Sequence, residues 1–293
     1  MGALQNFRRQ WRLDRRSLVS RLPRRLQYLL HYRSKFKTAC WRVRPRTFNE
    51  KLLYKLIYDH RPLLATLADK WLAREYVRRK IGDEVLVNLH LTTDRPEAIR
   101  LDQLPTRFVL KTNHGSGYVR IVKNKHQENE ADLQRTCRHW LSQNYGRLTG
   151  EWAYQSIAPR IMVEDFLDAG NGREPDDYKL FVFNGKVFLI QVDTDRFTDH
   201  RRDLFSTDWQ RFEVRYHHPN IGRPIPRPAG LERMLEIAEC LGAEIDFVRV
   251  DLYEVGGRVY FGELTHFPEN AGGRFDPAAF DALLGAQWQI QGY

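Results

Sequence analysis

Apolar residues between positions 49 and 81 recur with the period of an α-helix. Asn49 is placed to cap the first turn, Pro62 restarts the repeat, and Gly82 ends it. The pattern therefore predicts helical structure over 49–81. The residues that carry the start of the repeat are Leu52, Leu53, Leu56 and Ile57. Further helices are predicted over 95–105, 128–144 and 231–242.

Strand patterns lie between these helices. Alternating or continuous apolar runs predict strands over 84–91, 107–111, 117–122 and 159–168, and hairpins over 178–193 and 247–265. The Asn184-Gly185 pair is the strongest local turn signal in the chain. Antiparallel hairpins in the C-terminal half predict a mixed α+β fold, because a doubly wound sheet would alternate single strands with helices.

The stretch 108–117, "FVLKTNHGSG", joins two predicted strands through a loop that contains lysine, histidine and two glycines. In a Walker A loop the lysine follows the glycines and a helix comes next, and neither holds here. A protein kinase carries its lysine on the strand after the glycine-rich hairpin. We interpret the loop as a hairpin flap that closes over phosphates, with Lys111 reaching in from the preceding strand. A purely structural glycine turn is the alternative.

The last hairpin carries two acids, Asp251 and Glu263, on consecutive strands. A two-residue turn at Gly256-Gly257 would place the two carboxylates on opposite faces of the hairpin. A three-residue loop, 255–257, would place them on one face, and it suits a type I turn followed by a glycine bulge. We therefore predict the three-residue loop.

Two carboxylates that converge on apolar strands are typical of a site for a hard cation such as Mg²⁺. Thr265 and Asn270 supply further oxygen donors nearby, and Arg249 alternates onto the same face as the acids. The alternative is a surface hairpin in which Arg249 and Glu263 form a salt bridge. Apolar flanking residues favour the metal site, because they would make unpaired acids costly.

The composition of the chain indicates the class of protein and the compartment in which this chemistry takes place. The 293 residues are 42% hydrophobic and 12% aromatic, as in a soluble globular protein. No apolar run approaches the ~20 residues of a membrane span, and charges interrupt the N-terminus before the apolar core of a secretory signal forms. Three scattered cysteines predict neither disulfides nor a metal knuckle, which favours a reducing cytoplasm.

The net charge of +10 belongs to the N-terminal arm. Residues 1–50 hold fourteen Lys and Arg against two acids, which gives +12, and the other 243 residues sum to −2. Arginines interleaved with tryptophan, tyrosine and leucine are typical of a helix on an anionic membrane surface. A solvated helix that covers its own domain is the alternative. Nucleic acid is the weaker interpretation, because the rest of the chain carries no recognition module.

Taken together, these features resemble the ATP-grasp superfamily, and most closely its TupA-like branch. The resemblance covers roughly 47–287 and rests on seven stretches in order: "FNEKL", "LADKWLAREYVRRKIG", "FVLKTNHGSG", "PRIMVEDFL", "DDYKLFVFNGKV", "FVRVDLY" and "YFGELTHFPENAGG". It implies an ATP-grasp fold, in which two α+β subdomains clasp ATP between antiparallel sheets. The implied segments are a basic helical N-terminal arm (1–46), a helical pre-grasp region (47–106), a small subdomain with the flap (107–168) and a large subdomain with the metal-binding hairpin (169–293).

The resemblance also implies roles for individual residues. The nucleotide-binding set is Lys70 and Lys111 on the α- and β-phosphates, His114, Gly115, Ser116 and Gly117 in the flap loop, and the hinge Glu164, Asp165, Phe166 and Leu167, whose backbone reads adenine with Glu164 near the exocyclic amine. Lys179 and Arg196 face the phosphates or substrate, and Arg249 steadies the transferred phosphoryl group. Asp251 and Glu263 bind metal, with Thr265 where many relatives have asparagine, so Thr265 is expected to be a weaker ligand.

Some roles stay open at this stage. Asp168, Asp176 and Asp177 compete for the ribose. His114, His266 and Glu269 are candidate general bases. Asn270 or a water is a candidate to complete the metal shell beside Thr265.

The activity implied by the resemblance is an ATP-dependent carboxylate–amine ligase that forms an acyl phosphate, with ATP and two Mg²⁺ ions as cofactors. The expected role is in surface or capsular polysaccharide biosynthesis, where it would join an amino acid to a uronic-acid sugar or similar carboxylate. The expected location is cytoplasmic, with peripheral attachment to the inner face of the membrane through the basic arm. The alternatives are an ATP-grasp phosphotransferase, a glycosyltransferase with "DTD" at 193–195 as its metal motif, and a non-enzymatic, membrane-bound relative.

Overall fold

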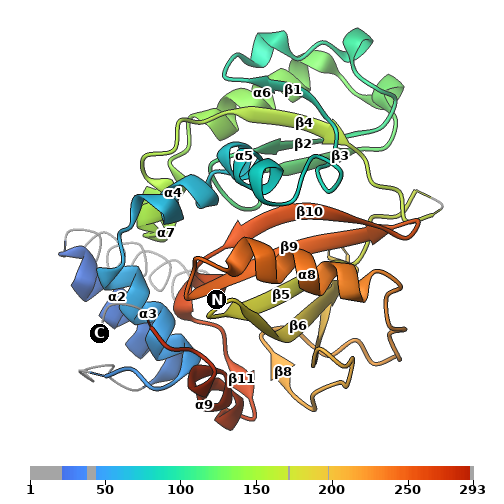
Figure 1. Ribbon diagram of the computed structural model, residues 1–293. Helices are drawn as coiled ribbons and strands as arrows, with labels where there is room; N and C mark the ends of the chain where they lie inside the picture. Colours follow the sequence, from blue (N-terminus) through green and yellow to red (C-terminus); the bar gives the residue numbers. More distant parts are fainter. Residues whose placement is uncertain (1–21, 38–43, 171, 197, 291–293) are drawn as a thin grey trace, which may run out of the picture.

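The computed structural model of the protein describes residues 22–37, 44–170, 172–196 and 198–290. Its framework is two antiparallel sheets, one above the other in Figure 1. The four-stranded sheet has the order β1-β4-β2-β3 and the five-stranded sheet the order β10-β9-β5-β6-β7. Their strands are β1 (Leu89–Thr93), β2 (Phe108–Thr112), β3 (Val119–Val122), β4 (Ile161–Asp165), β5 (Asp177–Phe183), β6 (Lys186–Thr194), β7 (Arg201–Phe205), β9 (Phe247–Val255) and β10 (Arg258–Thr265). The predicted α+β class is confirmed.

The large sheet is covered on both faces, and for this reason every residue of β5 is buried. On one face Leu180 and Val250 pack with Ile237 of helix α8 (Leu231–Gly242). On the other face one half is apolar, where Phe181 and Phe247 pack against Phe48. That half lies under helices α3 (Phe48–Tyr58) and α9 (Ala279–Ala286). The remaining half of this face is polar and is the part that matters for the site.

The small sheet has only one apolar face. In β2 Phe108 and Leu110 are fully buried with Cys137 of helix α6 (Glu130–Leu141). Val109 and Lys111 alternate to the opposite face and are only half-buried. Because side chains alternate along a strand, this pattern turns Lys111 toward the cavity between the two sheets, as predicted for a lysine below the flap.

The predicted helical segment 49–81 consists of three helices, α3, α4 (Pro62–Ala68) and α5 (Lys70–Lys80), and the predicted restart at Pro62 is confirmed. The prediction that Asn49 is the cap is wrong. Thr47 caps α3, and Glu50 completes a capping box with it. Asn49 lies inside the helix and is buried, where its amide donates to the carboxylate of Asp281 at 2.9 Å.

Two other sequence predictions differ from the structure. The strand expected over 84–91 begins later, as β1, and residues 84–88 contribute only a single bridge between Leu86 and Phe261. The short helix expected over 95–105 is a pair of 3₁₀ turns. The remaining short elements are the 3₁₀ turns Pro96–Ala98, Leu101–Gln103, Lys125–Gln127, Trp152–Tyr154 and Pro268–Ala271, helix α7 (Tyr145–Thr149), and the two-stranded sheet of β8 (Arg215–Tyr216) and β11 (Phe275–Asp276).

Of the predicted basic arm, the structure describes helix α2 (Arg24–Phe36) and a few flanking residues. Residues 1–21 and 38–43, with Trp11 and Trp41, lie outside the described part. None of the helices described is long and apolar enough to cross a membrane. The four predicted segment boundaries stay a prediction; β1, from the second segment, pairs with β4 of the third.

Candidate active site

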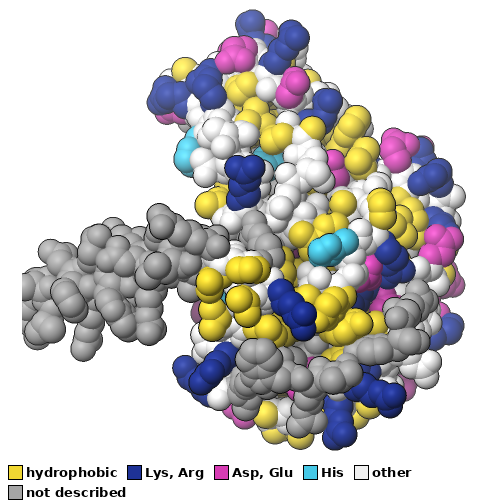
Figure 2. All heavy atoms as spheres, turned by 90° about the vertical axis from the view of Figure 1, so that its left-hand side faces the viewer, with side chains coloured by type: hydrophobic (Ala, Val, Ile, Leu, Met, Phe, Trp, Pro, Cys, Tyr) yellow, Lys and Arg dark blue, Asp and Glu magenta, His cyan; other side chains and the backbone are white. Residues whose placement is uncertain are grey.

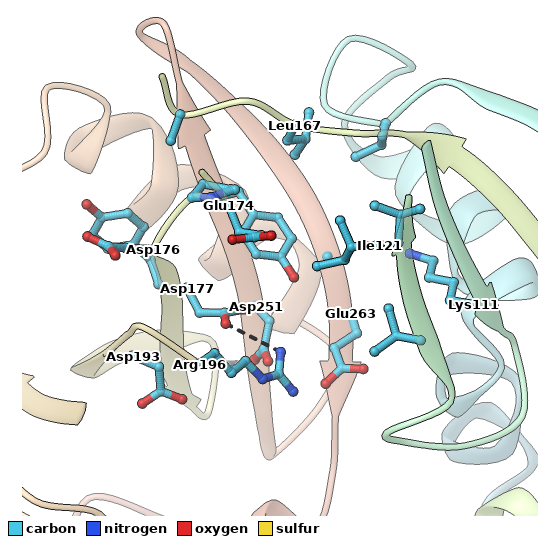
Figure 3. A pocket seen from close by; sticks show the side chains of 18 of the residues that line it. Lys111, Ile121, Leu167, Glu174, Asp176, Asp177, Asp193, Arg196, Asp251 and Glu263 are labelled. Carbon is cyan, nitrogen blue, oxygen red and sulfur yellow. Dashed lines mark hydrogen bonds and ion pairs between the residues drawn. The ribbon is translucent and has the colours of Figure 1, made fainter. Parts of the chain in front are cut away.

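A cavity of about 1300 Å³ lies between the polar half of the large sheet and the open face of the small sheet. In Figure 3 Asp251, Glu263 and Arg196 lie on the large-sheet side of this space and Lys111 on the small-sheet side. Most of the predicted site residues line the cavity: Lys70, Lys111, Gly115, Ser116, Gly117, Glu164, Asp165, Phe166, Leu167, Arg196, Asp251 and Glu263. His114, Lys179, Arg249 and Thr265 are not among the described residues of the lining.

The acid pair lies side by side, but the predicted three-residue loop is wrong. Val255 pairs with Arg258, so the turn has two residues, Gly256 and Gly257. The register then shifts between Phe261 and Glu263, and beyond this bulge Glu263 lies opposite Asp251. The bulge at Gly262 therefore restores the parity that the short turn would have broken.

The bulge has a tertiary cause. The backbone N–H of Phe261 donates to the carbonyl of Val85 at 2.7 Å, so a segment from outside the sheet engages the chain directly before the bulge. Gly262 fits because it has no side chain: a Cβ there would lie 2.9 Å from Tyr253 Cε2 and 3.1 Å from the carbonyl oxygen of Asp251.

The acid pair belongs to a row of polar side chains across four strands. Glu263 is opposite Asp251, Asp251 is opposite Lys179 of β5, and Lys179 is opposite Gln191 of β6. Residues opposite each other in adjacent strands project to the same face. The pairing of strands thus gathers residues that are up to 84 positions apart in the sequence, from Lys179 to Glu263.

Asp251 is held by two cations. Arg249 donates from Nε to Oδ1 and from Nη2 to Oδ2, both at 2.7 Å. The ammonium of Lys179 lies 2.7 Å from Oδ2 and 3.1 Å from Asp177. Burial by itself would lower the pKa of Lys179, but Asp177 and Asp251 raise it above its usual value. Both cations are therefore charged, and they fix the orientation of the carboxylate that faces the cavity.

Glu263 is held by a lysine from outside the sheet. Lys70, the first residue of α5, places its ammonium 3.0 Å from Oε2 of Glu263 and 2.8 Å from the carbonyl oxygen of Gly115. Burial alone would raise the pKa of Glu263, but the charges of Lys70 and Arg249 lower it well below its usual range. Lys70 thus connects the acid pair with the glycine loop.

The small-sheet wall has its own ion pair. Lys111 of β2 lies 2.5 Å from Oε2 of Glu164 on β4, and Arg74 of α5 lies 3.0 Å from Oε1. Glu164 lines the cavity at the start of the predicted hinge, but its carboxylate is shared between these two cations. Arg74 was not singled out from the sequence, because it lies within an ordinary helical pattern 90 residues from its partner.

The glycine loop joins β2 to β3, as predicted for a flap. Gly115 is packed closely: a Cβ there would meet Tyr145 at 2.9 Å and Tyr118 at 3.0 Å. Gly117 has φ of +83°, and no other atom lies within 4 Å of its Cβ position. The first glycine is therefore required by packing and the second by backbone conformation.

The residues present fit Mg²⁺ that shares its coordination with phosphate oxygens. Asp251 and Glu263 offer adjacent carboxylates to the cavity, and Mg²⁺ commonly takes one or two carboxylates together with substrate phosphates. Thr265 accepts a hydrogen bond from Arg249 Nη2 at 3.1 Å. In the described part of the chain, no three or more His, Cys, Asp or Glu side chains are grouped so that they could hold a metal ion by themselves.

The candidate general bases do not line the cavity within the described residues. His114 and His266 are buried. Burial lowers the pKa of His266 to about 3 and also lowers the pKa of His114. Glu269 forms an ion pair with Arg202 at 3.0 Å. None of the three side chains therefore stands as a base at the acid pair.

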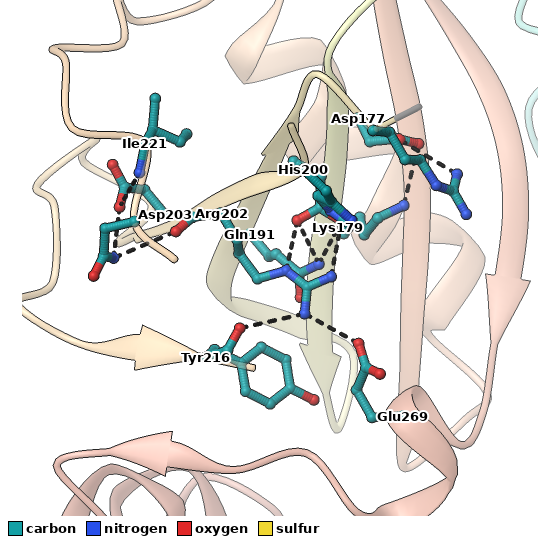
Figure 4. Close-up of polar contacts among 12 residues, drawn as sticks. Asp177, Lys179, Gln191, His200, Arg202, Asp203, Tyr216, Ile221 and Glu269 are labelled. Atoms are coloured by element: carbon teal, nitrogen blue, oxygen red, sulfur yellow. Dashed lines mark hydrogen bonds and ion pairs between the residues drawn. The ribbon is translucent and has the colours of Figure 1, made fainter. Parts of the chain in front are cut away.

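A second ion-pair network continues the polar face toward β7 (Figure 4). Arg202 binds Asp193 through Nε at 2.6 Å and Nη2 at 3.0 Å, and Gln191 donates to both carboxylate oxygens. Burial alone would raise the pKa of Asp193, but hydrogen bonds from His200 and Arg202 and the charge of Arg202 lower it well below its usual range. Asp193 belongs to the "DTD" stretch, and the structure gives this carboxylate a cationic partner.

Glu151 is a buried acid near Lys70 and Glu263 that sequence reasoning missed, and it is not among the described residues of the cavity lining. It follows α7 and is buried, and burial raises its pKa to about 7 in spite of the charge of nearby Lys70. A single glutamate between a helix and a 3₁₀ turn carries no sequence signal, so only the tertiary structure reveals its position near Lys70 and Glu263.

The sequence matches the family model described as TupA-like ATPgrasp over residues 50–289. The chain belongs to the TupA-like ATP-grasp family. The matched range agrees with the resemblance over 47–287, and the predicted family is thereby confirmed. No curated protein matches the chain significantly.

Solved structures similar to this TupA-like chain include several ligases. D-alanine–D-alanine ligase from Bacillus anthracis is 18% identical with a TM-score of 0.45, over 76% of this chain and 67% of that one. The ATP-grasp ligase PsnB, complexed with minimal precursor, is 15% identical with a TM-score of 0.40, over 70% and 54%. N5-carboxyaminoimidazole ribonucleotide synthetase from Thermus thermophilus is 12% identical with a TM-score of 0.39, over 74% and 47%. The chain thus spans between about half and two thirds of the length of these relatives.

Proposed function

We propose that this protein is an ATP-dependent carboxylate–amine ligase. A carboxylate oxygen of the substrate attacks the γ-phosphorus of ATP and ADP leaves, which gives an acyl phosphate. An amine nitrogen then attacks the acyl carbon, phosphate leaves, and the amine loses a proton. The observation that carries the proposal is the meeting of the acid pair, Asp251 and Glu263, with Lys70 and Lys111 across one cavity in a chain of the TupA-like ATP-grasp family.

In this proposal the nucleotide lies between the sheets. The adenine contacts the hinge 164–167, and Lys111 and Lys70 contact the phosphates below the flap. Asp176 is the favoured ribose ligand, because Asp168 does not line the cavity, and Asp177, which does, is already paired with Lys179 and Arg196. Asp168 is occupied by Arg107 at 2.5 Å. Binding of the phosphates requires Lys111 and Lys70 to exchange Glu164 and Glu263 for phosphate oxygens, and these ion pairs hold both ammonium groups at the cavity.

Asp251, Glu263 and the weaker ligand Thr265 would hold Mg²⁺, which neutralises the triphosphate charge when it is bound. Arg249 and Lys179 are positioning residues for Asp251, because their contacts with this carboxylate fix its direction. Arg196 lines the cavity, and its side chain is 40% exposed with one contact of 3.4 Å to Asp177. Arg196 is therefore freer than the buried Arg249 to reach the transferred phosphoryl group.

The substrates proposed are a uronic-acid sugar or a similar carboxylate and an amino acid, in surface or capsular polysaccharide assembly in the cytoplasm. The first alternative is a phosphotransferase that uses the same cavity and transfers phosphate to a glycan hydroxyl. The glycosyltransferase alternative is less well supported, because Arg202 and Gln191 already occupy both carboxylate oxygens of Asp193.

The test is a screen of amino acids and uronic-acid sugars for ATP-dependent phosphate release. A ligase releases ADP and inorganic phosphate, whereas a phosphotransferase releases ADP and a phosphorylated acceptor. Hydroxylamine adds a second criterion, because it converts an acyl phosphate into a hydroxamate and does not react in this way with a phosphorylated hydroxyl.

Glu263→Gln is the blank for this screen, and Glu254→Gln is its matched control on the same hairpin. Glu254 does not line the cavity; it accepts a hydrogen bond from the backbone of Gly230, which glutamine can also accept. We expect phosphate release to be lost in the first variant and retained in the second. Phosphate release unchanged in Glu263→Gln would refute the role of the acid pair.

A further inference from the structure

Helix α2 carries apolar side chains on opposite sides. Tyr28 and Tyr32 are 7% and 5% exposed and pack into the core beneath the large sheet. Leu26 and Leu30 lie two residues from them, which is about 200° around a helix, and they are 41% and 42% exposed. Leu22, which precedes the N-cap Pro23 of the helix, is 37% exposed. Leu22, Leu26 and Leu30 follow one another at four-residue intervals in the sequence and are all exposed; they are called the leucine stripe below.

The leucine stripe has no role in the packing of the described residues. The tyrosine side of α2 already attaches the helix to the core, and the hydroxyl of Tyr28 donates to the carbonyl of Gly150. Isolated exposed leucines are common on protein surfaces. Leu26 and Leu30 lie one turn apart on the same helix, and Leu22 lies just before its start, so the three exposed leucines are close along the chain and differ from isolated ones. Other exposed leucines of the described chain, Leu72, Leu148 and Leu283, lie on three separate helices.

The surroundings of the leucine stripe are basic and aromatic. Arg33 is exposed on the same side of α2. Arg25 lies 5.4 Å from the ring centre of Tyr58, whose side chain is 50% exposed. Figure 2 shows this side of the molecule, where hydrophobic side chains gather with Lys and Arg side chains beside them. The segment 1–50 that contains the helix carries +12, against −2 for the remainder.

We propose that the leucine stripe inserts into the surface of an anionic phospholipid bilayer. Leucines at helical spacing enter the boundary of the acyl chains, and arginines beside them contact the anionic headgroups. The charge of the segment selects this occupant. A second copy of the chain would bring two strongly basic segments together, and the stripe is small beside the ~800 Å² that each partner buries in a stable dimer. A polyanion such as nucleic acid would engage the arginines and leave the leucines without a role.

The test uses the full chain and vesicles of phosphatidylglycerol with phosphatidylcholine, against vesicles of phosphatidylcholine alone. Binding is measured by co-sedimentation at low and at physiological salt. The key variant is L22Q/L26Q/L30Q. Its matched control is L72Q/L148Q/L283Q, which removes three leucines of 37%, 67% and 43% exposure from other helices. A third variant, R25Q/R33Q, separates the charge from the apolar contribution. Circular dichroism and thermal unfolding verify that each variant is folded.

We expect the full chain and the matched control to bind the anionic vesicles and to leave the neutral vesicles unbound. L22Q/L26Q/L30Q should bind at least about tenfold more weakly, which corresponds to a loss of about 1.4 kcal/mol. R25Q/R33Q should bind more weakly and with a smaller dependence on salt. Three outcomes would overturn the proposal: equal binding by the leucine variant and the full chain, equal weakening in the matched control, or a full chain that ignores anionic vesicles and instead forms a dimer that L22Q/L26Q/L30Q abolishes. The proposal does not depend on the ligase reaction, so each can fail without the other.

Discussion

The close packing of the bulge at Gly262 predicts that a side chain at this position weakens the Mg²⁺-dependent binding of nucleotide. In Gly262→Ala the new methyl group would lie 2.9 Å from Tyr253 Cε2 and 3.1 Å from the carbonyl oxygen of Asp251. These contacts are shorter than the ~3.5–4.0 Å at which carbon atoms attract each other. Overpacking of this kind costs roughly 1–3 kcal/mol. We expect the strand to relieve it by moving the backbone of Asp251, which turns the two carboxylates out of line.

The assay is calorimetric titration with a non-hydrolysable ATP analogue, with Mg²⁺ and with chelator. If the whole strain of roughly 1–3 kcal/mol appears as misalignment of the two carboxylates, the affinity for the ATP analogue in the presence of Mg²⁺ falls roughly 5- to 150-fold, because about 1.4 kcal/mol corresponds to a factor of ten. Affinity in chelator should change little, because the hinge and lysines are untouched. The matched control is Gly256→Ala in the turn of the same hairpin, where a Cβ meets no atom within 4 Å but φ is +59°. It should lose about 1–2 kcal/mol of stability and retain binding. Equal Mg²⁺-dependent affinity in Gly262→Ala and wild type would refute the reasoning.

Three further predictions concern stability and reactivity. Lys55→Met removes the buried ammonium that neutralises Asp246 and should lower the free energy of unfolding by about 3–5 kcal/mol in urea titrations; Arg61, which also contacts Asp246, makes the lower value the expected one. Burial lowers the pKa of His266 to about 3, whereas an unfolded histidine titrates near ~6.5. Below pH ~6.5 the unfolded chain binds a proton at His266 that the folded chain excludes, so the contribution of His266 to the free energy of unfolding falls by about 1.4 kcal/mol per pH unit as the pH is lowered. In His266→Met the free energy of unfolding should therefore depend less on pH between about 6 and 4. An unchanged pH dependence in this variant would contradict the lowered pKa of His266. Burial also raises the pKa of the Cys137 thiol to about 12. In native protein a disulfide reagent should therefore modify Cys137 far more slowly than the half-buried Cys240. Mass spectrometry follows the modification, and the slow phase should be absent from a Cys137→Ser variant.

Local patterns predicted those parts of the fold whose causes are local. The hairpin at Asn184-Gly185 has the expected two-residue turn, with both residues at positive φ. The helix predicted over 231–242 has the same bounds in the structure. In these cases the turn residues and the apolar period lie within the element itself, so no distant contact alters them. The long helical segment was less well predicted, because Asp69 ends one helix and caps the next through its side chain.

The candidate site shows where local reasoning stops. The sequence correctly predicted that Asp251 and Glu263 share a face, but for a reason that the structure contradicts. The two-residue turn is what the paired glycines favour, and parity is restored five residues later by a bulge. That bulge adjoins a backbone contact between Phe261 and Val85, which are 176 positions apart. A hairpin sequence contains no information about such a contact.

By itself, the sequence determined the family, the glycine loop between two strands, the two lysines and the acid pair, because these are ordered motifs of defined residue types. Only the tertiary structure decided how each charge is balanced. Glu164 is shared by Lys111 and Arg74, Asp193 is held by Arg202, and Glu263 meets Lys70. Such pairs form between strands and helices that meet only in the folded chain. A buried charge must find a partner wherever the fold supplies one, and the order of residues along the chain does not specify which partner that is.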